Sequence, residues 1–318
     1  MGSNSASFGG AIYVGSDSIV TTSNCTLTSN TADVRDGAVY AHDRSIVNTY
    51  DCTMSANSAQ QGGAVYAGNA STVTIADCTM TSNTAMGAGG AIFAADDSGV
   101  TATDCSMISN TAHWGGAVSA HDSSIVTAIG CLLSLSTAIG WSGAVSAQGS
   151  STATAIDCSL VSHSAVRGGA VHATETATVT TSECTMTSNT AYWGGAVYAH
   201  GYSNLTTVDC SMTSNIARRH GADHAIDTQD GGGAIYATDA STVIASVITT
   251  HCTMTSNGAE KGGAVYASGK STAIATYFTI ASGQAAWGGG VYVVGDSVVI
   301  ATDCTMGLNT AQKATPPS

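Results

Sequence analysis

Residues 62–85 are GGAVYAGNASTVTIADCTMTSNTA, and this stretch recurs with small changes along the chain. Its first block, GGA(V/I)Y, places alanine at positions 11, 38, 64, 91, 117, 144, 170, 196, 234 and 264, with Gly290 in the eleventh copy. Its second block, CTMTSNTA, starts fourteen residues after each of the first eight alanines and recurs at Cys252 and Cys304, while Phe278 replaces one cysteine. The spacing is 26 or 27 residues, apart from two steps of 38 and 30. A fixed period of this size indicates a solenoid, in which each repeat packs on the next.

Each repeat contains three short runs in which apolar and polar residues alternate. Val73 and Ile75 alternate with threonines in one run, and Cys78 and Met80 do so in the next. Alternation with a period of two predicts strands, and the Gly-Gly, Asp-Ser and Asn-Thr-Ala segments between them are typical turns. We therefore expect an all-β fold, a right-handed parallel β-helix of eleven rungs of about 26 residues with three short strands per rung.

Two columns of equivalent residues indicate what faces the interior. The residue after the repeat alanine is Val or Ile, and the position of Met80 is always Met, Leu or Ile. A third column predicts an asparagine ladder at one corner, because stacked amides can bond to one another and to turn backbone. Its members are Asn30, Asn57, Asn83, Asn110, Asn189, Asn215, Asn257 and Asn309.

The repeats predict one β-helix domain over residues 1–318. An inserted loop is expected at 218–231 and a polar tail at 312–318. The chain starts and stops inside a rung, so open strand edges at both ends are expected to allow head-to-tail assembly into filaments, unless capping sequence lies outside the chain.

Composition excludes two classes of partner. The net charge is −13 with only eight Lys and Arg, which disfavours nucleic acid because few cations are available for the phosphates. The sequence has no apolar stretch of about 18 residues, so membrane insertion is not expected.

The GGAIY block at residues 9–13 and the C-T-(M/L)-x-x-N-x-A blocks resemble the repeats of chlamydial polymorphic outer-membrane proteins. Those repeats pair GGA(I/L/V) with FxxN, whereas this chain has Met or Leu in place of the Phe, and no C-terminal transporter barrel follows. The resemblance covers nearly the whole chain. It implies a right-handed β-helix displayed outside a cell, often in adhesion.

An aromatic column is the first candidate binding feature. It is expected on an outward face, where exposed rings could bind sugars or another protein, although stacking between rungs also explains it. The proposed binding residues in this column are Tyr40, Tyr66, Tyr198, Tyr236 and Tyr266.

Outward T-x-T pairs are the second candidate. Thr79 and Thr81, and Thr185 and Thr187, form such pairs on the third strand of their repeats. The pattern resembles the flat threonine arrays of β-helical ice-binding proteins, but threonine is also a favoured strand residue.

Metal ligands and thiols form the third group of candidates. Aspartates that precede many of the cysteines could bind calcium or could act as solvated turn caps. In the inserted loop, His220, Asp223, His224 and Asp227 are ligand types for a weak metal site, although such loops are usually only polar. The cysteines could pair between rungs or form a reduced, buried column. No cofactor is required by any of these patterns.

No repeat gathers two carboxylates and a Lys or Arg on one strand face, as a pectin-lyase type of enzyme would need. We therefore expect no enzyme. The expected function is an extracellular or cell-surface structural or adhesive β-solenoid. Its partners would be further copies of itself, in head-to-tail or lateral contact, or other surface proteins and glycans. Ice binding and carbohydrate binding are the alternatives.

Overall fold

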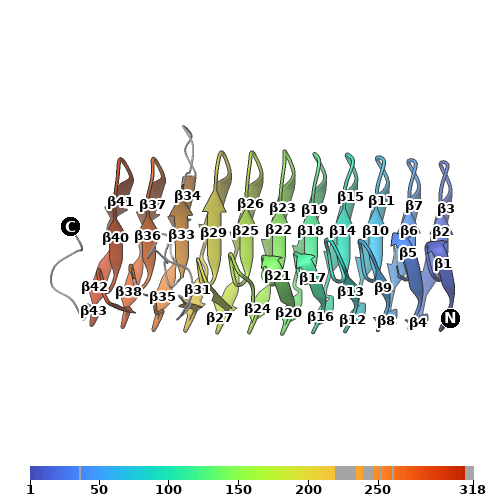
Figure 1. Ribbon diagram of the computed structural model, residues 1–318, viewed down its shortest axis with the longest axis horizontal. Helices are drawn as coiled ribbons and strands as arrows, with labels where there is room; N and C mark the ends of the chain where they lie inside the picture. The colour runs from blue at the N-terminus through green and yellow to red at the C-terminus, as the bar shows by residue number, and fades with distance from the viewer. Residues whose placement is uncertain (36, 219–233, 239–245, 251, 260, 312–318) are drawn as a thin grey trace, which may run out of the picture. The chain divides into compact units, whose positions relative to one another are not determined.

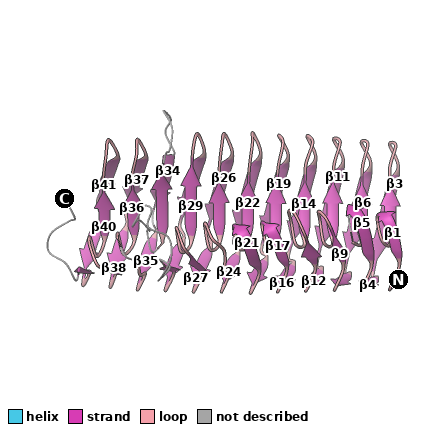
Figure 2. Cartoon of the chain, in the orientation of Figure 1, coloured by secondary structure: helices cyan, strands magenta, loops and turns pink. Residues whose placement is uncertain are grey.

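The computed structural model describes residues 1–35, 37–218, 234–238, 246–250, 252–259 and 261–311. These residues form strands joined by tight turns, with no helix among them (Figure 2). The described part of the chain accordingly has no helix long and apolar enough to cross a bilayer. The chain divides into two compact units, Met1–Ser159 and Leu160–Ser318. The prediction that residues 1–318 form a single domain stays a prediction.

In the first unit, equivalent strands of successive rungs lie side by side in four parallel sheets (Figure 1). The first-strand sheet contains β2 (Ile12–Val14), β6 (Val39–Ala41), β10 (Val65–Ala67), β14 (Ile92–Ala94), β18 (Val118–Ala120) and β22 (Val145–Ala147). The second-strand sheet contains β3 (Ile19–Ser23), β7 (Ile46–Tyr50), β11 (Thr72–Ala76), β15 (Gly99–Thr103), β19 (Ile125–Ile129) and β23 (Thr152–Ile156). The third-strand sheet contains β4 (Thr26–Thr28), β8 (Thr53–Ser55), β12 (Thr79–Thr81), β16 (Ser106–Ile108) and β20 (Leu132–Ser134). The fourth-strand sheet contains β1 (Ser5–Phe8), β5 (Thr31–Arg35), β9 (Ser58–Ala59), β13 (Thr84–Ala85), β17 (Thr111–Trp114) and β21 (Thr137–Trp141).

The second unit repeats this order of strands; β24 (Ser159–Val161) spans the division between the units. First strands are β25 (Val171–Ala173), β29 (Val197–His200), β33 (Ile235–Thr238), β36 (Val265–Ala267) and β40 (Val291–Val293). Second strands are β26 (Thr178–Ser182), β30 (Asn204–Val208), β34 (Ser246–Thr250), β37 (Thr272–Thr276) and β41 (Val298–Thr302). Third strands are β27 (Thr185–Thr187), β31 (Ser211–Thr213), β35 (Thr253–Thr255), β38 (Thr279–Ala281) and β42 (Thr305–Gly307). Short fourth strands pair as β28 (Thr190–Ala191) with β32 (Ile216–Ala217) and as β39 (Gln284–Ala285) with β43 (Thr310–Ala311).

The register of the rungs follows the sequence period. Met80 pairs with Met54 on one side and with Met107 on the other, so each residue stacks on its equivalent one repeat away. The predicted parallel β-solenoid with a spacing of about 26 residues is therefore confirmed. The short fourth strand was not predicted from the sequence.

Alternation along the strands separates the interior from the surface. On β11 and β12, the side chains of Val73, Ile75 and Met80 are at most 1% exposed, whereas Thr72 and Thr79 are exposed. Parallel strands that surround one interior keep their inward positions apolar because no water reaches them.

The corners of each rung need the left-handed backbone conformation. In the third rung, Gly62, Asp77 and Ser82 have φ values of 64°, 55° and 56°. Glycine adopts this region without a Cβ clash, and Asp, Asn and Ser tolerate it better than β-branched residues do. This requirement explains why small and acidic residues recur at the corners.

The asparagine ladder lies inside the corner that joins the third and fourth strands. Asn57 donates through Nδ2 to Leu27 O and Asn83 Oδ1, both at 2.9 Å. Its own Oδ1 accepts from the backbone N–H of Asn30 at 3.0 Å and from Asn30 Nδ2 at 2.9 Å. The predicted ladder is therefore confirmed for these residues, and it satisfies polar groups that the turn would otherwise bury unpaired.

Replacement of one ladder residue should destabilise the fold strongly. Asn57→Ala leaves the donors of Asn30 and the carbonyl of Leu27 without their partner, at a cost of about 3 kcal/mol. Urea denaturation followed by circular dichroism measures this loss. Asn48→Thr is the matched control because Asn48 lies on the outer side of β7, where the next rung has Thr74. Equal midpoints for the two variants would contradict the structural role of the ladder.

Candidate functional site

The outer faces of the second- and third-strand sheets carry ranks of hydroxyl groups, and we call them the hydroxyl faces. Thr79 is exposed and Thr81 half-buried on β12, where they pair with Thr53 and Ser55 of the preceding rung. Thr185 and Thr187 have the same exposure on β27 and pair with the next rung at β31. The predicted outward T-x-T pairs are thus present in both units.

The longest threonine rank is on the second-strand sheet of the first unit. In this rank, each threonine pairs with the equivalent threonine of the next rung, from β11 to β23; its members are Thr74, Thr101, Thr127 and Thr154. The repeat period predicts this rank, because each of these threonines stands four residues before the repeat cysteine.

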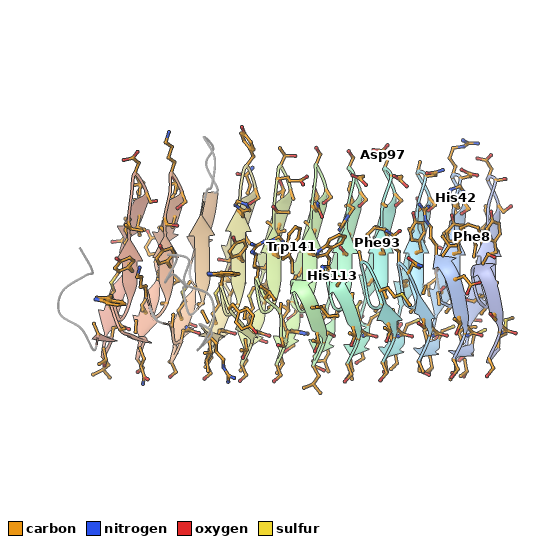
Figure 3. All side chains as sticks on the ribbon, viewed as in Figure 1. Phe8, His42, Phe93, Asp97, His113 and Trp141 are labelled. Carbon is orange, nitrogen blue, oxygen red and sulfur yellow. The ribbon has the colours of Figure 1, made fainter. Side chains whose placement is uncertain are left out.

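The hydroxyl faces have no formal charge in the first unit. The strands β3, β7, β11, β15, β19 and β23 and the third strands from β4 to β20 contain no Asp, Glu, Lys, Arg or His. Acidic residues lie instead at the turns, as Asp97 does between β14 and β15 (Figure 3). The faces are therefore neutral, and they present hydroxyl and methyl groups except where larger exposed side chains such as Ile19, Ile46 and Ile125 interrupt them.

The aromatic column differs from its prediction. Tyr40 and Tyr66 are 3% and 1% exposed, and Tyr198 and Tyr266 are 5% and 0% exposed. The expectation that these rings lie open on an outward face is wrong for the four residues. The side chain of Tyr236 lies outside the described part of the structure, although its backbone pairs with Tyr198 and Tyr266.

Burial of the column has a clear cause in the first unit, where residues of fourth strands, such as Arg35 and Trp114, lie against its rings. Tyr40, Tyr66 and Phe93 pack in one cluster with Ala88, and Trp114 of β17 packs against it. Figure 3 shows Phe93 on β14, and His113 and Trp141 on fourth strands of this unit. Sequence alternation distinguished the two sides of the first strand, but it could not reveal that a later segment covers the outer side.

Within the column, rings stack from rung to rung. The ring centroids of Tyr40 and Tyr66 are 5.2 Å apart with an interplanar angle of 25°, and those of Tyr266 and Tyr292 are 5.6 Å apart at 8°. The alternative explanation, stacking between rungs, is confirmed for these pairs. The hypothesis of carbohydrate binding by exposed rings of this column is therefore not supported, because the rings of these pairs stack on one another.

Cations extend the aromatic stack. The guanidinium of Arg35 lies 5.0 Å from the ring centroid of Tyr66, and that of Arg167 lies 5.3 Å from Trp193. The ammonium of Lys261 lies 5.4 Å from the ring of Tyr292, in a side chain that is only 8% exposed. These contacts place three of the few basic residues in structural roles, as cation–π partners.

The acidic column has a conformational explanation. Asp51, Asp77 and Asp104 are exposed, and each has a φ between 51° and 55°, in the left-handed region. Among the described residues, no three His, Cys, Asp or Glu side chains form a group that could hold a metal ion. The candidate ligands His220, Asp223, His224 and Asp227 lie outside the described residues.

The cysteines form a column of free thiols. The backbone N–H of Cys52 donates to Cys78 Sγ at 3.3 Å, and the Cys52 thiol donates to Tyr50 O at 3.1 Å. Burial raises the pKa of the Cys78 thiol to about 11. The thiols of Cys52 and Cys78, whose pKa values burial raises, are therefore protonated at neutral pH and act as small apolar groups with weak hydrogen bonds.

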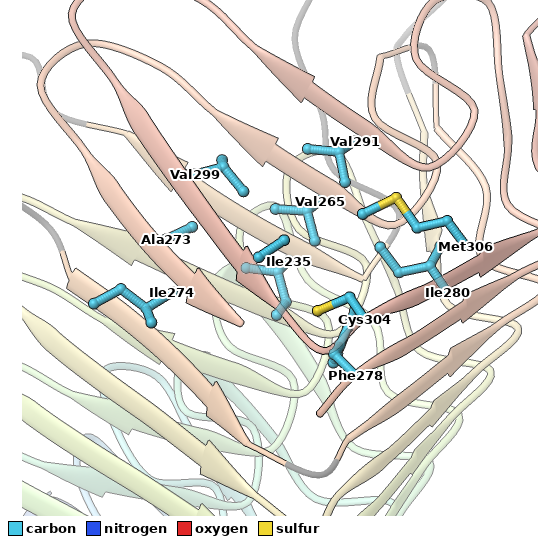
Figure 4. A pocket seen from close by; sticks show the side chains of 11 residues that line it. Ile235, Val265, Ala273, Ile274, Phe278, Ile280, Val291, Val299, Cys304 and Met306 are labelled. Atoms are coloured by element: carbon cyan, nitrogen blue, oxygen red, sulfur yellow. The ribbon is translucent and has the colours of Figure 1, made fainter. Parts of the chain in front are cut away.

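An apolar pocket lies inside the last rungs of the second unit (Figure 4). Val265, Ile280, Val291 and Met306 are among its lining residues, and Cys304 contributes the only thiol of that lining. The lining contains no Asp, Glu, His, Lys or Arg to act as an acid–base partner. The pocket is partly open, since Val291 and Cys304 of its lining are half-buried and Met306 is 51% exposed.

In-register parallel strands around an apolar interior define the class of the protein as a parallel β-solenoid. A family model described as the right-handed β-helix region matches residues 7–180, more than half of the chain. The chain belongs to this right-handed β-helix family. No curated protein and no solved structure matches the sequence. The resemblance to chlamydial outer-membrane repeats is a resemblance of sequence motifs, and no comparison extends it.

One buried histidine should make stability depend on pH. His172 on β25 stacks on Tyr198 at 5.2 Å, and burial, reinforced by the charges of Arg167 and His200, holds its pKa well below the ordinary value of 6.5. The unfolded chain therefore binds a proton below pH 6.5 that the folded chain does not. The stability that depends on neutral His172 is present above that pH and decreases as the pH falls, by up to about 1.4 kcal/mol per pH unit.

The measurement is the thermal midpoint between pH 7.5 and pH 5. His172→Tyr, which places the usual residue of the column at this position, should flatten the decrease on the acid side. His113→Gln is the control, because it replaces a half-buried histidine of a fourth strand and leaves His172 in place. An unchanged profile in His172→Tyr would show that other groups cause the acid sensitivity.

Proposed function

We propose that the protein is a non-enzymatic structural β-solenoid of the cell surface or extracellular space that adheres through its hydroxyl faces. The observation that carries this proposal is the neutral array of in-register hydroxyls, of which Thr74, Thr101, Thr127 and Thr154 form the longest rank. Support for a non-enzymatic role comes from the apolar lining of the pocket in the second unit.

Such an array favours many weak contacts over one strong site. Strands one rung apart are separated by about 4.8 Å, and alternate side chains of one strand by about 7 Å, so hydroxyls repeat in two directions. A partner that is itself repetitive, such as a polysaccharide or a sheet edge of another protein, can satisfy many of these groups together. The gain comes from multiplicity, since each exchanged hydrogen bond contributes little by itself.

The proposed location and partners rest on two further observations. The repeat motifs resemble those of bacterial surface proteins, which favours display outside the cell. The net charge of −13 disfavours nucleic acid and anionic surfaces. We propose neutral glycans, other surface proteins, or further copies in lateral or head-to-tail contact as the partners.

Adhesion can be measured with beads that carry the purified chain on surfaces coated with neutral polysaccharide or with the chain itself. Thr74→Glu with Thr101→Glu introduces two charges into the longest rank outside the fifth rung and should reduce bead retention several-fold, because carboxylates must be desolvated to make contact. Gln60→Glu with Gln284→Glu is the charge-matched control, since both residues are exposed outside the strands of the hydroxyl faces. Equal retention of both variants would rule out the hydroxyl faces as the adhesive surface.

Ice binding is the second candidate, and the two-dimensional order of the threonines favours it. The rank from Thr74 to Thr154 and the pairs such as Thr79 and Thr81 present methyl and hydroxyl groups at regular intervals. A regular array of this kind can order water on a flat surface. The third-strand face is less regular, because Ile108 and Leu132 interrupt its threonines and serines.

Thermal hysteresis of the purified chain separates the two candidates. An ice-binding protein should show a gap between melting and freezing that a Thr79→Tyr/Thr185→Tyr variant reduces, since two bulky rings would break the flatness of the faces. Asn69→Tyr is a suitable control, because it adds a ring at an exposed turn. Absence of hysteresis in the parent chain would exclude the ice-binding candidate and leave the adhesive one.

A further inference from the structure

The fifth rung, residues 117–142, departs from the repeat at several corners and columns within the first unit. Gly130 replaces the aspartate of the acidic column, and Leu135 replaces the serine of the next corner. Ser136 stands where the ladder has asparagine, and Ser119 pairs with Phe93 of the aromatic column. Each of these positions follows the common pattern in the fourth rung, and the departure at Ser119 continues into the sixth rung, at Ser146.

The same rung has an unusual number of exposed aliphatic side chains. Their exposed fractions are 55% for Ile125, 37% for Ile129, 39% for Leu132, 56% for Leu135 and 68% for Ile139. In the rung before it, the partners of the first three are Gly99, Thr103 and Ser106. Polar or small residues are therefore compatible with the fold at these positions, and the fold does not require Ile125, Ile129 or Leu132 to be aliphatic.

Three of these side chains occupy outward positions of β19 and β20 beside a residue of the next rung, with Thr127 between Ile125 and Ile129. Ile125 and Ile129 lie on β19, Leu132 lies on β20 just past the corner at Gly130, and Ile156 pairs with Ile129. We call Ile125, Ile129, Leu132 and Ile156 the fifth-rung patch. Because Gly130 has no side chain, the carboxylate of Asp104 lies over this corner, in the space that a side chain would occupy.

Leu135 shows a further sign of a surface shaped for contact. Its φ is 55°, a conformation that leucine rarely adopts, and more than half of its side chain is exposed. The same corner is occupied by Ser29, Ala56, Ser82 and Ser109 in the first four rungs, and by Leu308 in the last rung. The leucine therefore brings both an unfavourable conformation and an exposed apolar group to the fifth rung.

The charge around the patch has one sign. Residues 45–166 contain seven aspartates and no Glu, Lys or Arg. Asp104 and Asp157 stand at the same corner one rung before and one rung after Gly130, so carboxylates flank the patch on both sides. An apolar surface between two anionic groups is complementary to an apolar segment that carries cations.

We propose that the fifth-rung patch docks a segment of another protein in which aliphatic residues alternate with lysine or arginine. The aliphatic side chains would cover Ile125, Ile129 and Leu132, and the cations would approach Asp104 and Asp157. A second copy of this part of the chain would bring further aspartates to the contact, and an anionic membrane would be repelled in the same way. The proposal does not depend on whether the hydroxyl faces adhere.

The test uses fluorescence anisotropy of a short labelled peptide of alternating leucine and lysine, titrated with the full chain. Peptides of alternating serine and lysine, and of leucine and glutamate, serve as comparators. The leucine–lysine peptide should bind most tightly. Ile129→Thr/Leu132→Ser, which copies residues of the fourth rung, should weaken its binding about tenfold or more. Asp104→Asn/Asp157→Asn should weaken it several-fold and reduce its dependence on salt.

Ile46→Thr is the matched control, because Ile46 is 39% exposed on β7 and the next rung has Thr72 at that position. It should leave the affinity unchanged. Equal binding by the parent and the Ile129→Thr/Leu132→Ser variant, no binding of the leucine–lysine peptide, or equal binding of the serine–lysine peptide would each overturn the proposal. Concentration-dependent dimers that this double variant abolishes would identify a second copy as the occupant and would overturn it as well.

Discussion

The backbone hydrogen bonds between rungs are the constraint on which the rest of the structure depends. The backbone N–H of Thr79 donates to Cys52 O at 2.9 Å, and that of Val65 donates to Ala91 O at 2.8 Å. Each strand is therefore bonded to residues about one period away. Every side chain within a unit must therefore be compatible with the equivalent side chain of the next rung, about 4.8 Å distant. Methionine, asparagine and tyrosine columns meet this condition by packing, hydrogen bonding and stacking, whereas carboxylates meet it only at exposed corners.

The same constraint explains how much the sequence could predict. Because the period gives the register, the inward position of Met80, the strands around Ile75 and the ladder through Asn57 all follow from alignment of the repeats. The left-handed corners are also visible, since Asn24 and Gly130 share with Asp77 the ability to adopt a positive φ. The left-handed backbone conformation of these corners therefore explains the recurring aspartates without a bound metal ion.

The period could not predict what covers the outer side of a strand. Tyr66 alternates with inward residues as a surface residue does, yet it is 1% exposed, because residues of fourth strands, such as Arg35 and Trp114, lie against the rings of its column. Those strands are as short as the two residues of β13, and their alternation is too brief to give a signal. Of the two candidate binding surfaces that the sequence offered, the aromatic column is covered, whereas the hydroxyl faces keep exposed residues such as Thr101, in register with half-buried Thr74.

Because most columns of equivalent residues are uniform, a residue that departs from its column can indicate a role other than folding. In a repeat whose fold accepts Thr or Ser at an outward position, a change to an exposed Ile or Leu adds nothing to the interior and reduces solubility. One such change is ordinary, but the fifth rung combines Ile129, Leu132 and Leu135 with the loss of a carboxylate at Gly130. A solenoid can accommodate this combination because each rung contacts only its neighbours, so a single rung can acquire a binding surface while the others preserve the stack.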